Sequence, residues 1–244
     1  MTPPNSGASA HSQYRVVAGG APATSLRWLG HSCVLLMTSS GAGVLMDPIP
    51  PGYGYEGPAL EGVDAVTVTH EHADHTNVSM AAGSPLVLRG LAGGDWATID
   101  QIVKDVHIRA VGTCHDEAGG TKRGKNASFV FEADGMRIAH LGDLGHVLSD
   151  EQAAALGPVD VLLIPVGGFY TIDSGQAAQV VEQLDARVVI PIHFKTSRLR
   201  PDWPGVGVDA FLTGKEIQRS SGSVYTFTKE TLPASPVVVL LNPE

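Results

Sequence analysis

The densest group of chemically active side chains lies between Thr69 and His75, where the sequence is Thr-His-Glu-His-Ala-Asp-His. Zinc binds imidazole and carboxylate ligands readily, and a hydrolytic metal site keeps one coordination position free for water. A solvated polar loop that happens to contain histidines is the alternative interpretation. Three histidines within six positions, with an aspartate between them, favour the metal site.

Three further candidate ligands stand at the ends of other strand-like segments, as the first cluster does: His115, Asp143 and His193. Each is weak evidence alone, because a single histidine after a strand is usually an ordinary hydrogen-bonded residue. Together with the first cluster they supply seven donors, the number that two neighbouring metal ions sharing a bridging water would use. We therefore expect these strands to end at one edge of the sheets.

The elements that must position these residues are predicted from apolar runs separated by turn-forming residues. Asp134-Gly135 is a hairpin signal, and residues 48–62, with four prolines and four glycines, are predicted as a surface loop bordering the site. Residues 112–117 are predicted as a loop. The predicted helices are 77–82, 149–154 and 173–184, and the predicted strands are 26–29, 34–37, 44–46, 63–68, 85–88, 95–98, 103–110, 128–132, 136–140, 159–165, 187–192, 224–227 and 237–241. This mixture predicts one α/β domain of two sheets with helices outside.

The composition is that of a globular chain of 244 residues, 43% of them hydrophobic, with a net charge of −9. Only 16 residues are Lys or Arg, which argues against nucleic acid as the main partner. No apolar run is long enough to span a bilayer. A small-molecule substrate suits this charge balance better.

The N-terminal residues 1–25 are rich in Ala, Gly, Ser, Pro and Thr and are predicted to be disordered, apart from a short strand at Tyr14–Val17. Residues 26–244 are predicted as a single domain. The N-terminal segment lacks the basic and apolar regions of a signal peptide, and Cys33 and Cys114 form no CxxC pair. We expect a cytoplasmic protein with reduced thiols, and the sequence leaves homo-oligomerisation open.

The chain resembles the metallo-β-lactamase superfamily. Its HxHxDH motif is present as His70, His72, Asp74 and His75, and the later ligands match in order and spacing those of binuclear members such as glyoxalase II. Four short segments are similar to the small stand-alone metal-dependent hydrolases of this superfamily: residues 29–33, 45–48, 140–146 and 165–168. That subgroup is related to the L-ascorbate-6-phosphate lactonases and to the N-acyl-phosphatidylethanolamine phospholipases D.

The resemblance implies a four-layer αβ/βα sandwich of two mixed sheets, with the metals at the shared edge. It also implies two divalent ions, with zinc expected and manganese or iron as alternatives. The first ion would be held by His70, His72 and His115, and the second by Asp74, His75 and His193, with Asp143 bridging. A hydroxide between the ions would attack a carbonyl or phosphoryl centre of a small ester, lactone or phosphodiester.

Other residues are assigned roles around this centre. Asp74 is also a candidate to orient the water or receive its proton. His146 is a candidate substrate contact or leaving-group acid, with a structural role as the alternative. Tyr170 and Lys195 are candidate substrate contacts, although a surface lysine is the simpler interpretation of Lys195. For His31 the sequence leaves two roles open, lining the pocket or a purely structural role.

Four more residues are weighed as supporting or solvated groups. Asp47 and Asp64 are predicted to hydrogen-bond the ligating imidazoles, with a plain structural role as the alternative. Glu71 does not fit the zincin pattern and is expected to be solvated or to lie behind the ligands. Arg123 is either an anion contact or a solvated loop residue.

Three alternative functions remain open from the sequence. One is a mononuclear iron oxidoreductase, because persulfide dioxygenases share the HxHxDH motif. A nuclease is disfavoured by the acidic charge. A binding or scaffold module without catalysis is disfavoured because all seven ligand positions are filled.

Overall fold

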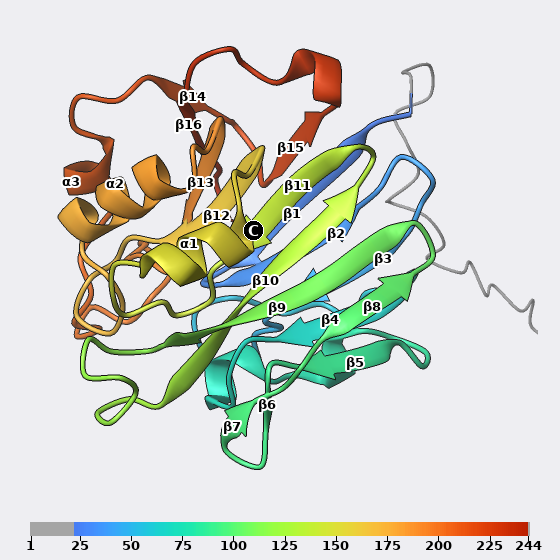
Figure 1. The fold of residues 1–244 in the computed structure, drawn as a ribbon, viewed down its shortest axis with the longest axis horizontal. Coiled ribbons are helices and arrows are strands. Elements are labelled where there is room, and N and C mark those ends of the chain that lie inside the picture. The colour runs from blue at the N-terminus through green and yellow to red at the C-terminus, as the bar shows by residue number, and fades with distance from the viewer. Residues whose placement is uncertain (1–21, 244) are drawn as a thin grey trace, which may run out of the picture.

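The computed structural model describes residues 22–243 as two mixed β-sheets with helices packed outside (Figure 1). The first sheet has the strand order β15-β1-β2-β3-β4-β5, in which β3, β4 and β5 run parallel and the other pairs antiparallel. Its strands are β1 (Thr24–Gly30), β2 (Cys33–Met37), β3 (Gly43–Met46), β4 (Ala65–Val68), β5 (Leu86–Arg89) and β15 (Val224–Phe227).

The second sheet has the order β14-β16-β13-β12-β11-β10-β9-β8. Strands β8 to β11 pair antiparallel, whereas β11, β12, β13, β16 and β14 pair parallel. Its strands are β8 (Asp100–Val103), β9 (Val106–Cys114), β10 (Lys125–Ala133), β11 (Met136–His140), β12 (Val161–Pro165), β13 (Val188–Ile192), β14 (Ile217–Arg219) and β16 (Val237–Leu240). A separate two-stranded ribbon joins β6 (Leu91–Ala92) to β7 (Asp95–Trp96).

The main core lies between the two sheets. Successive side chains of a strand point to opposite faces, so Val34 and Leu36 of β2 join the inter-sheet core, while Cys33 and Leu35 join a second cluster on the outer face. Strands that are apolar on both sides must be covered on both sides. The first sheet is therefore an internal layer, as the continuous apolar runs of the sequence indicate.

Three α-helices, α1 (Asp150–Leu156), α2 (Ser174–Gln183) and α3 (Asp209–Leu212), lie together on the side of the second sheet (Figure 1). Helices α1 and α2 each begin with a capping box, built on Ser149 and Asp173. Helix α1 packs on β9 and α2 on β12. The predicted two-sheet sandwich with outer helices is confirmed.

The outer face of the first sheet is covered differently from the prediction. The helix expected at residues 77–82 is a single 3-10 turn, η2 (Val78–Met80). This turn and the Pro- and Gly-rich loop cover the sheet instead, through Ile49, Tyr55, Leu60 and Met80. Another 3-10 turn, η1 (Ala73–His75), lies within the histidine cluster, and a third, η3 (Lys229–Thr231), lies near the C-terminus.

Two predicted elements of the second sheet were wrong in their extent. The strand expected over residues 103–110 is broken by a two-residue turn, in which Lys104 adopts φ +53° and Val103 pairs with Val106. Residues 112–114, expected in a loop, continue β9 because they pair with β10. At the N-terminal side, β1 begins at Thr24, and the predicted strand at Tyr14–Val17 lies outside the described residues.

Six strands deliver their C-terminal ends to one edge of the sandwich. In the first sheet these are β1, β3 and β4, which run in the same direction, and in the second they are β9, β11 and β13. The residues that follow them are His31, Asp47, the 69–75 segment, His115, Asp143 and His193. The predicted common edge is confirmed. Among residues 22–243, no helix is both long and apolar enough to cross a membrane.

Candidate metal centre

The histidine loop is held in place from below by Asp47, which is fully buried. Its carboxylate accepts hydrogen bonds from the Thr69 backbone N–H (2.8 Å) and the Thr69 hydroxyl (2.7 Å), and it pairs with His75 Nδ1 at 2.9 Å. The Thr69 hydroxyl also lies 3.0 Å from His70 Nδ1. One carboxylate thus orients two imidazoles by way of their Nδ1 atoms, leaving both Nε2 atoms free to face the site.

The first candidate ligand group consists of His70, His72 and His115, whose ligand atoms all lie within 4.8 Å of one another. His70 and His115 are buried, and His72 is exposed. The ring nitrogens His70 Nε2 and His72 Nδ1 are 3.0 Å apart. Two imidazoles from the first sheet and one from the second therefore face a common point.

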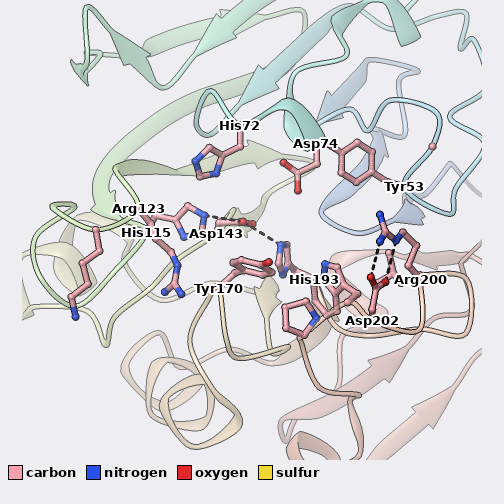
Figure 2. Close-up of a pocket in the computed structure, with 15 residues that line it drawn as sticks. Tyr53, His72, Asp74, His115, Arg123, Asp143, Tyr170, His193, Arg200 and Asp202 are labelled. Carbon is pink, nitrogen blue, oxygen red and sulfur yellow. Dashed lines mark hydrogen bonds and ion pairs between the residues drawn. The ribbon is translucent and has the colours of Figure 1, made fainter.

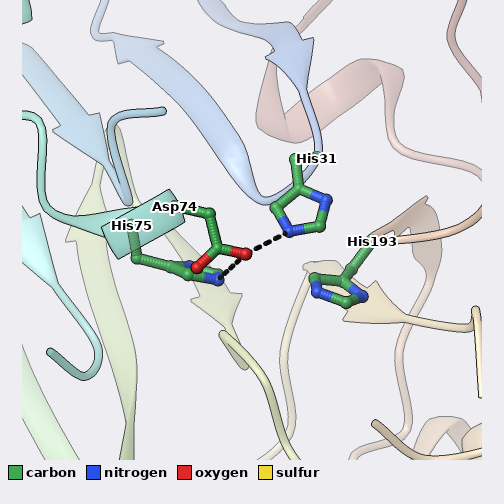
Figure 3. A group of neighbouring side chains, drawn as sticks. All are labelled: His31, Asp74, His75 and His193. Carbon is green, nitrogen blue, oxygen red and sulfur yellow. Dashed lines mark hydrogen bonds and ion pairs between the residues drawn. The ribbon is translucent and has the colours of Figure 1, made fainter. Parts of the chain in front are cut away.

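The second candidate group contains Asp74, His75 and His193, with His31 beside them (Figure 3). Figure 3 shows Asp74 pointing between His31 and His75, with Asp74 Oδ2 3.1 Å from His31 Nε2 and 3.8 Å from His75 Nε2. The rings of His31 and His193 lie 4.0 Å apart. His31 is 2% exposed, so it belongs to this group and is not a surface residue.

Asp143 stands between the two groups. Its Oδ2 atom lies 3.2 Å from Nε2 of both His115 and His193, 3.4 Å from His75 Nε2 and 3.9 Å from His70 Nε2. A single carboxylate oxygen surrounded by four imidazole nitrogens from both groups has the geometry of a bridging ligand. The loop that carries Asp143 is anchored by Asn126, whose Oδ1 accepts the Asp143 N–H at 3.1 Å.

Close packing of the ligand loops depends on glycines. A Cβ atom at Gly145 would lie 2.2 Å from the His115 carbonyl carbon, and one at Gly167 would lie 2.2 Å from the His193 carbonyl oxygen. Real Cβ atoms essentially never come this close to backbone. These two glycines therefore allow neighbouring loops to approach the ligand backbones directly.

The electrostatics of the centre are dominated by its buried carboxylates. Burial acts to raise the pKa of Asp143, but His193 and His75 outweigh it and hold that pKa well below its usual range. Burial likewise acts to lower the pKa of His75, but Asp143 and Asp47 hold it well above its usual range. The pKa of His31 is lowered to about 4 by desolvation and by its neighbour His193. The buried anions require positive charge in this cavity.

The donor set fits metal ions. His75 Nε2 is buried and has no hydrogen-bond partner among the described residues, although it points at the carboxylates. His70 Nε2 and His72 Nδ1 face each other as two atoms that can share only one proton between them, unless a cation takes its place. Imidazole and carboxylate donors are those that zinc and related divalent ions prefer.

Above the donors lies a pocket of about 750 Å³ (Figure 2). Asp74, His72, His115, Asp143 and His193 form its floor. The walls carry three aromatic rings and three cationic side chains: Tyr53, Tyr170, Trp203, Lys122, Arg123 and Arg200. Gly52 and Tyr53 also line the pocket, so the Pro- and Gly-rich loop borders the site as predicted.

Comparison with known proteins places this fold and centre in a family. Residues 25–193 match the family model described as a beta-lactamase superfamily domain. The chain belongs to the metallo-β-lactamase superfamily. A UPF0173 metal-dependent hydrolase of Methanosphaerula palustris is 30% identical over 213 residues, covering 80% of this chain and 92% of the relative. One from Methanospirillum hungatei is 33% identical over 196 residues, covering 72% and 86%.

A solved structure from the same superfamily supports this assignment. The crystal structure of a putative Zn-dependent hydrolase of this superfamily from Thermotoga maritima matches with a TM-score of 0.71 and 33% identity, covering 89% of this chain and 98% of that one. The predicted resemblance to the superfamily and the predicted α/β sandwich are confirmed. The narrower link to L-ascorbate-6-phosphate lactonases stays a prediction.

The structure brings together, at one edge of the two sheets, all seven residues predicted as metal ligands. Two of the donor groups contain the residues predicted for the two ions, and Asp143 lies between them, while their roles as ligands stay a prediction. Tyr170 lies in the pocket wall, as a substrate contact would. Glu71 points away from the centre to Arg89, at 2.6 Å, and is exposed.

Two predicted roles do not fit the geometry. His146 Nε2 accepts a hydrogen bond from the Cys114 N–H at 3.1 Å, and its Nδ1 bonds the Val147 carbonyl at 2.8 Å, so neither nitrogen is available to a leaving group. Lys195 donates its Nζ protons to the carbonyls of Pro201 (2.7 Å) and Trp203 (2.8 Å). It supports the loop that carries Trp203 and does not line the pocket.

The predictions for Asp47 and Asp64 have different outcomes. Asp47 contacts the imidazole of His75, a candidate ligand, as predicted. The prediction for Asp64 was wrong, because this residue accepts the Gly43 N–H at 2.9 Å and pairs with Lys104 at 2.7 Å, away from the centre. Its position before β4 puts it at the strand's opposite end from the histidines.

Sequence reasoning missed three residues of the site. Asn126 and Thr69 act through hydrogen bonds to backbone and to ring nitrogens, and such polar residues carry no pattern of their own. Trp203 lies 5.7 Å from His193, ring to ring, and lines the pocket. An aromatic residue between two prolines in a loop just after the last ligand was the signal that could have revealed it.

Proposed function

We propose that this protein is a hydrolase with two divalent metal ions, zinc being the expected metal, which cleaves a small ester, lactone or phosphodiester. The observation that carries the proposal is the position of Asp143 between two donor groups, within 3.2 Å of an imidazole from each. The metal-dependent hydrolases among the relatives support the reaction class.

In this proposal, His70, His72 and His115 hold the first ion, Asp74, His75 and His193 hold the second, and Asp143 is shared. Two such ions would lower the pKa of a water molecule and polarise the carbonyl or phosphoryl oxygen of a substrate. Asp47 and Thr69 keep the ring nitrogens of His70 and His75 directed at the centre.

Asp74 is the residue that we assign to accept the proton of the attacking water. It is the candidate ligand carboxylate that is partly exposed, with 25% of its side chain accessible, and it lines the pocket. His31 Nε2, at 3.1 Å, fixes the position of its Oδ2 atom. Asp74 can therefore orient an attacking water and receive its proton. The aromatic rings of Tyr170 and Trp203, whose centres lie 6.0 Å apart, give one side of the pocket an apolar surface.

The test combines metal analysis with a panel of generic ester, lactone and phosphodiester substrates. We expect about two divalent ions per chain and an activity that His115→Ala and Asp143→Ala abolish. His107→Ala is the matched control, because His107 lies on the same strand that leads to His115 but pairs with Asp100 and Glu132 outside the site. A single iron per chain would refute the binuclear hydrolase and favour the oxidoreductase. Activity that survives both ligand substitutions would exclude this centre as its source.

A further inference from the structure

Two of the three cationic side chains in the pocket walls have no carboxylate partner in the part of the chain that the structure describes. Arg200 is paired with Asp202 at 2.6 Å (Figure 2). Within residues 22–243, by contrast, no carboxylate pairs with the side chain of Lys122 or Arg123, although both line the pocket. The whole chain has 25 acidic and 16 basic residues, so two unpaired cations beside the active centre are not explained by composition.

Arg123 is held by aromatic rings. Its guanidinium carbon lies 5.6 Å from the centre of the Tyr170 ring (Figure 2). The same atom lies 5.8 Å from the centre of the Phe169 ring. The two rings meet edge to face, with centres 4.7 Å apart. A ring face attracts the cation without neutralising its charge. The stacking therefore orients the guanidinium and leaves its N–H donors available.

The backbone below Arg123 is fixed by Asp116, which is 4% exposed. The Asp116 carboxylate accepts four backbone N–H groups of the following loop, from Ala118 (2.8 Å), Gly120 (3.0 Å), Lys122 (2.9 Å) and Arg123 (2.7 Å). The loop then closes next to a candidate ligand, since the His115 N–H donates to the Gly124 carbonyl at 3.0 Å. Arg123 is thereby held at a set position beside the first ligand group.

We propose that Arg123, assisted by Lys122, binds a carboxylate or phosphate group of the substrate, and that the enzyme therefore acts on small anionic molecules. This inference rests on the proposed hydrolase function. The planar fork of a guanidinium matches an oxyanion with two parallel hydrogen bonds. The anion would sit on the His115 side of the pocket, with the scissile bond over Asp143 and an apolar stem against Tyr170.

The test compares two esters with the same leaving group, 4-nitrophenyl butyrate and 4-nitrophenyl hemisuccinate, which differ by a terminal carboxylate. Loss of charge-assisted hydrogen bonds should lower kcat/KM of Arg123→Ala for the hemisuccinate about tenfold or more. The ratio of its kcat/KM for the hemisuccinate to its kcat/KM for the butyrate should therefore fall, because the neutral ester offers the guanidinium no charged partner. Arg123→Lys should recover part of the loss. The exposed Arg219 on β14 gives the control Arg219→Ala, which should change neither value.

An equal loss for both esters, or an unchanged hemisuccinate value, would overturn the inference. Failure of the proposed function has a different signature, namely no hydrolysis of either ester by the wild type, or hydrolysis that persists in Asp143→Ala. In that case, calorimetric titration of the full-length, metal-loaded protein with phenylphosphonate and with benzoate decides. About tenfold weaker binding of either anion by Arg123→Ala would sustain the inference. Equal binding by both proteins, or no binding by the wild type, would refute it.

Discussion

The substitution Asp47→Asn tests how far the metal centre depends on a residue that would not touch the metal. Asp47 is fully buried and adopts φ +42°, a conformation that asparagine also tolerates. Asparagine has nearly the same volume, so the backbone and packing should survive. What changes is the charge and one acceptor, because the new amide group would place an N–H where Asp47 Oδ2 now faces His75 Nδ1 at 2.9 Å.

The size of the effect follows from that contact. Burial acts to raise the pKa of Asp47, but the charge of His75 and its hydrogen bond lower it, so the residue is a carboxylate at neutral pH. A hydrogen bond to such a charged group contributes about 1.5–3 kcal/mol. Because His75 is a candidate ligand, loss of this hydrogen bond should weaken metal binding about 10- to 100-fold.

The assay is competition for zinc between the protein and a chromophoric chelator. Asp64→Asn is the matched control, because Asp64 is another aspartate beside the same sheet that pairs with Lys104 away from the centre. We expect Asp64→Asn to bind zinc like the wild type. Thermal unfolding in chelator should show that both variants fold. Loss of a hydrogen-bond partner of a metal ligand usually weakens metal binding by more than tenfold. A zinc affinity of Asp47→Asn within about twofold of the wild type would therefore refute the role of Asp47 in orienting His75.

Three further outcomes are expected. Gly145→Ala should lower the unfolding midpoint and weaken zinc binding, because its Cβ would meet the His115 backbone at 2.2 Å; unchanged thermal melts and chelator titrations would contradict this. Lys195→Met should leave the metal content unchanged but reduce kcat/KM, because the loop around Trp203 loses its hydrogen bond from Lys195. A drop in bound metal would contradict the assignment of Lys195 to this loop. Asp134→Asn should cost about 1–2 kcal/mol of unfolding free energy near neutral pH, because Asp134 accepts hydrogen bonds from Thr24 (2.5 Å) and Ser39 (2.8 Å) across the sheets. Burial acts to raise the pKa of Asp134, but these hydrogen bonds outweigh it and lower the pKa. The carboxylate therefore stabilises the fold above the pKa of the unfolded state, and the destabilisation by Asp134→Asn should shrink as the pH falls below about 4. Urea titrations that show a larger destabilisation at low pH would contradict this.

Much of the centre could be predicted because its ligands follow buried strands. An apolar run identifies a strand, the donor that follows it marks the strand's end, and parallel strands bring such ends together. His70, His115 and His193 were found in this way, although they lie far apart in the chain. The sandwich was predictable for the same reason, since both faces of β2 and β3 are apolar.

The errors arose where geometry is decided by contacts between distant segments. The turn at Lys104 has no Gly or Asn to announce it, and the long pairing of β9 with β10 determines where the strand ends. His146 and Lys195 lie close in the sequence to the candidate ligands Asp143 and His193, but backbone carbonyls and an N–H group occupy their polar atoms. His31 was left undecided because its partner Asp74 lies 43 residues away.

The way in which Asp116 gathers the loop after His115 has a consequence for protein engineering. All four hydrogen bonds to its carboxylate come from main-chain N–H groups, so the side chains at residues 118, 122 and 123 do not determine the shape of the loop. Gly120 is the exception that has to stay, because it adopts φ +83° and a Cβ there would lie 2.9 Å from the Gly124 carbonyl oxygen. The other three side chains can be exchanged in a library while the anchor and the neighbouring ligand stay unchanged. Substitutions at residues 118, 122 and 123 can therefore be used to change substrate selectivity without altering the residues at the pocket floor.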